Sequence, residues 1–225
     1  MNERDSSLDV GRRMMAFNWL PAAYAHADWL GHWADALGPR GAVSMRVLQR
    51  ASVALLDRHD LRVRYLREVG LHGWLLQSHR EVSAIAEVLG TAMLGGWVRS
   101  RLERREVAAQ QAVLGPQGRQ LALRHALELK ALPFAPDAAG WPVTADGPAS
   151  LGRLGFSCLA ALLDDATDGA RERFTLRFAR GTINPIELTK AQRSEALALI
   201  HEHDGTGATN SASAPAGTNP SHPAP

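Results

Sequence analysis

Histidines are the residues of this chain whose spacing could first suggest a metal site. His201 and His203 flank a glutamate, but two ligands on one helix must be four residues apart to face the same way. His26 and His32 are six apart, which is also a poor ligand spacing. His72 and His79 have no Cys or carboxylate partner at ligand spacing. We therefore predict neither a metal site nor a cofactor.

Ser157 and Cys158 are the candidate nucleophiles. The segment 155–159, Gly-Phe-Ser-Cys-Leu, resembles the nucleophile elbow of hydrolases, but the second glycine is missing and no strand precedes it. Cys158, the single cysteine, lies on an apolar helical stripe that runs from Leu151 to Leu162. A reactive thiolate needs a cationic, partly exposed site instead. We expect a core helix here and no catalytic residue, whereas a hydrolase would need one of the two side chains to be exposed.

Charge is concentrated in a few segments. Asp164, Asp165 and Asp168 form a small acidic cluster, which predicts a solvated helix end or a weak cation site. All but two of the 25 basic residues are arginine, whose planar guanidinium suits phosphate and carboxylate partners. The segment 46–67 is the most basic part of the chain. It fits a solvated or protein-binding face, and the alternative is a nucleic-acid-binding regulator that uses this region.

Length and composition bound the fold. The chain has 225 residues, of which 45% are apolar and 21% charged, with a formal net charge of +2. These values exclude a fully disordered chain, a disulfide scaffold, a fibrous protein and a membrane channel. No apolar run approaches the ~20 residues that span a bilayer, and no signal peptide is visible. We expect a cytoplasmic protein.

Helical periodicity accounts for most of the chain. We expect helices over 22–37, 42–59, 97–112, 116–131, 151–163 and 190–203, with another between Val82 and Met93. The pairs Gly95-Gly96 and Gly115-Pro116 mark breaks or close crossings. Thr189 and Gln192 predict a capping box for the last helix. The alternation of Phe174, Leu176 and Phe178 is the one strand signal that we single out.

The expected fold class is therefore mostly α, a compact multi-helix single domain with at most one or two short strands. We divide the chain into a flexible N-terminus (1–15), a helical domain (16–204) and a disordered tail (205–225). The tail has no charge, no aromatic residue and no Leu, Ile or Val, so it cannot contribute to a core. The segment 133–149 is expected to be a loop or linker.

One stretch resembles a known family. Phe17 to His26 reads Phe-Asn-Trp-Leu-Pro-Ala-Ala-Tyr-Ala-His, which resembles the opening of the type III secretion accessory proteins of the SctK (YscK/PscK, Hrp-type) family. Ala54 to Asp57, the helix from Gly152 and the segment Glu172 to Arg180 are similar to later parts of that family. The resemblance spans roughly Phe17 to Gly181. It does not cover the tail or the region from His59 to Gln77.

The resemblance implies a non-enzymatic adaptor in the cytosolic sorting platform of the injectisome. Such a protein would link the cytosolic domain of the SctD-like inner-membrane ring protein to the SctQ-like pod, and indirectly to the SctL stator and the SctN ATPase. It would lie at the cytosolic face of the inner membrane through these partners, with no membrane insertion and no nucleic acid. A charged face gives register and association rate more than affinity.

Six residues are our candidates for partner binding. Arginine and tryptophan dominate interface hot spots, so we select basic residues at and after the end of the predicted helix 42–59, and tryptophans of the aromatic stripe. The alternatives are that the arginines are solvated and that the tryptophans pack in the core. The candidates are Arg58, Arg62, Arg64, Arg67, Trp29 and Trp33.

Overall fold

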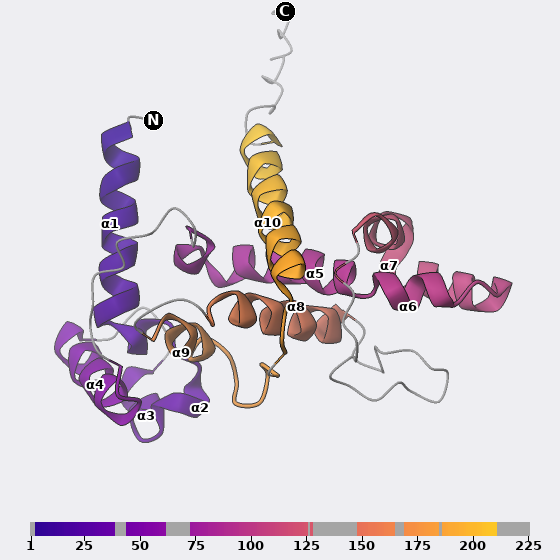
Figure 1. The fold of residues 1–225 in the computed structure, drawn as a ribbon. Coiled ribbons are helices and arrows are strands. Elements are labelled where there is room, and N and C mark those ends of the chain that lie inside the picture. Colours follow the sequence, from indigo (N-terminus) through magenta and orange to yellow (C-terminus); the bar gives the residue numbers. More distant parts are fainter. Residues whose placement is uncertain are drawn as a thin grey trace, which may run out of the picture.

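The computed structural model describes residues 3–38, 44–61, 73–125, 127, 148–164, 169–184 and 186–210. Throughout these ranges the regular secondary structure is helical, and no strand occurs in them (Figure 1). The mostly α class predicted from the periodicity is confirmed.

Two antiparallel helices, α5 (His79–Met93) and α8 (Pro148–Leu162), lie side by side at the centre of the molecule (Figure 1). Their backbones touch at two glycines. A Cβ atom placed on Gly155 would lie 1.7 Å from the Ala86 carbonyl oxygen, and one on Gly90 would lie 2.0 Å from the Leu151 oxygen. Both helices therefore need glycine at this crossing.

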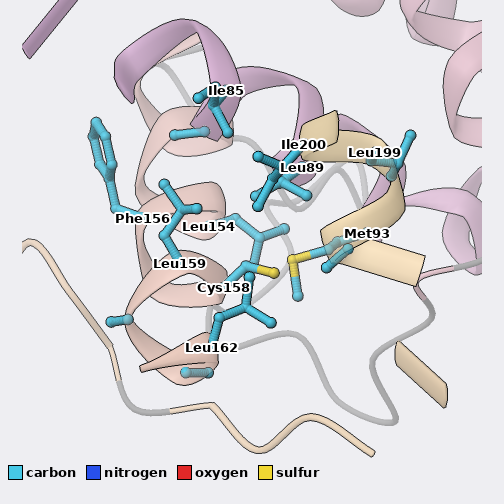
Figure 2. Packing of buried hydrophobic residues seen from close by; sticks show 14 of the residues in the cluster. Ile85, Leu89, Met93, Leu154, Phe156, Cys158, Leu159, Leu162, Leu199 and Ile200 are labelled. Carbon is cyan, nitrogen blue, oxygen red and sulfur yellow. The ribbon is translucent and has the colours of Figure 1, made fainter. Parts of the chain in front are cut away.

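The main core forms where α10 (Lys190–Asn210) packs against this pair. Ile85 and Leu89 of α5 meet Leu154 and Cys158 of α8, while Leu199 and Ile200 of α10 approach from the side (Figure 2). Thr189 and Gln192 exchange side-chain-to-backbone hydrogen bonds of 2.8 and 3.3 Å at the start of α10. The predicted capping box is confirmed, and it fixes where this helix begins.

A second hydrophobic cluster lies in the N-terminal part of the chain. It is formed by η1 (Pro21–Ala23), α2 (Ala27–Leu30), α3 (Trp33–Leu37) and α4 (Met45–Arg58), next to α1 (Glu3–Trp19). The continuous helix expected over 22–37 is wrong, because the chain bends between these short elements. Gly31 has φ 57°, a left-handed conformation that glycine adopts without steric cost.

The ends of the chain differ from the sequence expectation in their secondary structure. Much of the 1–15 segment that we expected to be flexible is part of helix α1, and α10 continues beyond His203 to Asn210. Flexibility of the first segment and disorder of the tail stay predictions. Residues 211–225 lie outside the described ranges.

On the side away from α2–α4 lie α6 (Gly95–Ser100) and α7 (Arg104–Arg124) (Figure 1). The helix expected over 97–112 is divided after Ser100. Gly95 marks a helix start and a close crossing together, since a Cβ there would lie 2.6 Å from the Ala122 carbonyl oxygen. Gly115, with φ 67° and ψ 171°, breaks α7 as Gly115-Pro116 predicted.

The strand expected around residues 174–178 is wrong. Phe174 lies in the last turn of the short helix α9 (Ala170–Thr175), and Leu176 and Phe178 follow in turns. All three side chains are buried, and the rings of Phe174 and Phe178 lie 5.0 Å apart. The alternation of apolar residues therefore reflects burial around the end of a helix and does not indicate a strand. The short helix η2 (Gly73–Leu76) lies nearby, with Trp74 edge-on to Phe174 at 5.4 Å. The expected loop over 133–149 falls mostly outside the described residues.

Candidate partner-binding surface

The Phe17–His26 motif has a structural role, because its side chains and backbone connect neighbouring helices. Phe17 and Tyr24 stack with ring centroids 5.4 Å apart, and the Tyr24 hydroxyl donates to the Phe17 carbonyl at 2.8 Å. Burial raises the pKa of Tyr24 well above its ordinary value, so the phenol stays a donor. The Ala22 amide donates to Ser52 Oγ of α4 at 3.2 Å. The motif thus connects α1, η1 and α4.

The segment 176–180 ties this N-terminal part to the main core. Backbone groups of alternate residues in this segment form hydrogen bonds with residues of α2 and its N-cap. The His26 amide donates to Leu176 O at 2.7 Å, the Trp29 indole Nε1 donates to Phe178 O at 2.6 Å, and the Arg180 amide donates to Asp28 Oδ2 at 3.1 Å. These three bonds position Trp29 from residues far away in the sequence.

Around Trp29 the structure brings together a cationic and aromatic group, which we name the Trp29 surface: Trp29, Arg58, His59 and Arg180. The Arg180 guanidinium carbon lies 4.7 Å from the centre of the Trp29 ring, within cation–π range. His59 lies edge-on to the same ring at 5.5 Å. Arg58 Nη1 donates to the Trp29 carbonyl at 3.4 Å, where a cation complements the C-terminal end of α2. Both arginines are exposed.

His59 is held neutral by its neighbours. Burial lowers the pKa of its imidazole, and the charges of Arg58 and Arg180 lower it further. Its Nε2 is buried without a hydrogen-bond partner in the described part of the chain. The positive charge of the Trp29 surface therefore comes from its two arginines.

The structure places the six predicted partner-binding residues in different environments. Trp29 and Arg58 come together as described. Trp33 is half-buried against the second cluster, with its Nε1 unbonded within the ranges that the structure covers. Arg62, Arg64 and Arg67 lie outside the described residues. Sequence reasoning missed Arg180 and His59, because the fold alone brings Arg180 to Trp29 across 151 positions of chain.

The hypothesis of a hydrolase that uses Ser157 or Cys158 as its nucleophile is wrong. Ser157 is 1% exposed and Cys158 fully buried. Ser157 Oγ donates to the Arg153 carbonyl at 2.9 Å and accepts from the Asn184 amide at 3.0 Å. Burial raises the pKa of the Cys158 thiol to about 12, so no thiolate forms near neutral pH.

Of the acidic cluster, the structure describes Asp164. Asp164 pairs with Arg171, and Arg193 lies 3.6 Å from its other carboxylate oxygen. Asp165 and Asp168 are outside the described residues. Within the described ranges, no group of three or more His, Cys, Asp or Glu side chains could hold a metal ion.

A cleft of about 370 Å³ opens beside the Trp29 surface, between α5, α8 and the segment 177–182. Its base is aromatic, since Phe156 and Phe178 lie 4.2 Å apart and His79 stacks over Phe156. Arg177 lines the cleft, and its guanidinium donates to the carbonyls of Leu75 at 3.2 Å and Gln77 at 2.7 Å. The lining residues are His26, His79, Ser83, Glu87, Gly152, Arg153, Phe156, Arg177, Phe178, Ala179 and Thr182.

The fold and these surfaces define a helical protein with cation-and-aromatic contact areas, a composition suited to binding another protein. A protein-family model described as YOP proteins translocation protein K (YscK) matches residues 14–204. The chain belongs to this family, which is the SctK family of type III secretion. Comparison with curated proteins and with solved structures found no match. In the described part of the chain, no helix is both long and apolar enough to cross a bilayer.

Proposed function

We propose that this chain is a non-enzymatic cytosolic adaptor of the type III secretion sorting platform. It links the cytosolic domain of the SctD-like inner-membrane ring protein to the SctQ-like pod, and through the pod to the SctL stator and the SctN ATPase. Family membership makes it a type III secretion protein. The adaptor role and the named partners are the proposal.

The observation that carries the proposal is the Trp29 surface. Trp29 is locked by the indole bond to Phe178 O at 2.6 Å, and the exposed Arg58 and Arg180 flank it. A rigid tryptophan costs little conformational entropy when a partner covers it. Flanking guanidinium groups select a partner that presents carboxylates. A fixed tryptophan flanked by exposed arginines is typical of a protein-binding hot spot.

The test is a deletion strain complemented with variants. Deleting the gene is expected to abolish effector export while the membrane rings still assemble, as seen by purifying the rings. Normal export from the deletion strain would refute the proposal. In the complemented strain, Arg58→Glu with Arg180→Glu is expected to lower co-purification with the pod or ring protein at least ten-fold. The control is Arg124→Glu, on the exposed end of α7.

A nucleic-acid-binding regulator is the second candidate. Arg46 and Arg50 lie exposed on α4 with no hydrogen bond or ion pair in the described part of the chain, so they are available to phosphates. Binding of this kind weakens steeply with salt. A mobility shift with a steep salt dependence, lost in Arg46→Glu with Arg50→Glu, would support it. No shift at low salt would dismiss it.

A further inference from the structure

We propose that the cleft between α5, α8 and residues 177–182 binds a segment of another secretion-apparatus protein that carries an acidic residue beside an apolar one. This inference rests on the proposed function, because it takes the partner from the same apparatus. It adds a second contact area, distinct from the Trp29 surface, and names the chemistry of its occupant.

The floor of the cleft selects an apolar side chain. Phe156 and Phe178 are buried, and both line the cleft together with His79, whose ring lies 5.7 Å from Phe178. Phe156 also lies on the side of α8 away from Cys158 and Met93 (Figure 2). It therefore stands at the edge of the core, where an incoming aliphatic or aromatic side chain can extend the packing.

The charges of the cleft select a carboxylate. Arg153 is exposed at the cleft, and its guanidinium makes no hydrogen bond or ion pair in the described part of the chain. Arg177 adds a second positive charge from the wall. A guanidinium with free donors binds a carboxylate in a bidentate manner. The acidic residue of the occupant would pair with Arg153.

A protein segment fits this site better than nucleic acid does. Glu87 lines the same cleft from α5 and forms no ion pair in the described ranges, so the cleft presents charges of both signs, which a phosphate chain with negative charge alone does not complement. A peptide, by contrast, can present a backbone N–H or a basic side chain to Glu87 while its carboxylate meets Arg153. The observations therefore favour a peptide.

Gly152 is the position at which a side chain can be added to narrow the cleft. It lies in α8 and lines the cleft, and a Cβ atom placed there would meet Phe156 Cε2 at 3.8 Å, an ordinary contact within the described residues. Alanine at this position is therefore tolerated. A larger side chain would extend into the space that the occupant needs.

The experiment is photo-cross-linking in the bacterium with the full chain. A benzoyl-phenylalanine placed at Thr182 lines the cleft, and mass spectrometry identifies the cross-linked peptide. We expect a segment of another apparatus protein that contains an Asp or Glu next to an apolar residue. Gly152→Phe and Arg153→Glu are each expected to lower the yield at least ten-fold, while Gly152→Ala retains it.

Each other outcome overturns the inference. These outcomes are the absence of any cross-link, a cross-link to a second copy of this chain, to nucleic acid or to a segment without acidic residues, and an unchanged yield in both variants. Circular dichroism melting of each variant confirms folding. If the deletion abolishes export but Gly152→Phe and Arg153→Glu restore it fully, without a cross-link, the cleft inference fails while the adaptor proposal stands. Normal export from the deletion strain instead defeats the adaptor proposal.

Discussion

At the scale of single residues, two glycines of α8 differ in how much space a side chain would have. Gly155 and Gly152 lie on the same helix, three positions apart, yet a Cβ on Gly155 would lie 1.7 Å from a backbone oxygen of α5 and one on Gly152 would lie in ordinary contact. Backbone atoms cannot turn aside as a flexible side chain can. The crossing therefore depends on the absence of one carbon atom.

We predict that Gly155→Ala lowers the free energy of unfolding by about 3 kcal/mol or more, because the helices must separate and open the core. Gly152→Ala is the matched control. It is expected to leave stability unchanged or to raise it by about 0.5–1 kcal/mol, since alanine restricts the unfolded chain. Urea unfolding of both variants measures the difference. Equal stabilities would show that the crossing is not tight.

His59 predicts a pH dependence at the same scale. Burial and the nearby Arg58 and Arg180 lower the pKa of the folded imidazole below its ordinary 6.5. As the pH falls through 6.5, the unfolded chain gains a proton that the folded chain resists, so this residue costs stability in acid. The cost is absent above about pH 7.5.

The variant His59→Phe keeps an aromatic ring against Trp29 but cannot titrate. We therefore expect its melting temperature to fall less between pH 7.5 and 5.5 than that of the wild type. Other titrating groups contribute equally to both proteins, so the comparison isolates His59. A larger fall in the variant would contradict the lowered pKa.

At the scale of elements, local signals were predictable and distant ones were not. The capping box at Thr189 and the break at Gly115 depend on residues within a few positions, and both are confirmed. The alternation of Phe174, Leu176 and Phe178 predicted a strand wrongly, because apolar residues buried around a helix end can alternate with polar ones as in a strand. The Trp29–Arg180 contact and the cleft arise from tertiary packing, which no local pattern carries.

The start of α10 gives a prediction at this scale. Thr189 Oγ1 accepts from the Gln192 amide, which is otherwise without a helical partner. Thr189→Ala is expected to lower the free energy of unfolding by about 1 kcal/mol. Lys190→Ala, one residue later and exposed, is expected to change it by less than about 0.5 kcal/mol. Chemical unfolding compares them, and equal effects would mean that the cap contributes nothing.

At the scale of the whole molecule, two hydrophobic clusters are joined through the segment 176–180. Leu176 belongs to the N-terminal cluster and Phe178 to the main core, and Tyr24 packs against both clusters. The backbone bonds of this segment to α2 make the two clusters one unit. Such rigidity suits the proposed adaptor role, because a flexible connection would not hold two partners at a fixed distance.

The connection between the two clusters through the segment 176–180 is tested by two matched tryptophan variants. Trp29→Phe keeps a ring beneath Arg180 but leaves the Phe178 carbonyl without its indole donor, which lies 2.6 Å away. An unsatisfied buried carbonyl costs about 1–3 kcal/mol. We therefore expect amide hydrogen exchange to speed up at least ten-fold in α2 and α4, while α5 and α8 stay protected. Trp33→Phe removes an indole N–H that has no partner in the described residues, so its exchange should match the wild type. Faster exchange in both variants, or in α5 and α8 as well, would mean that ring size rather than the indole bond holds the two clusters together.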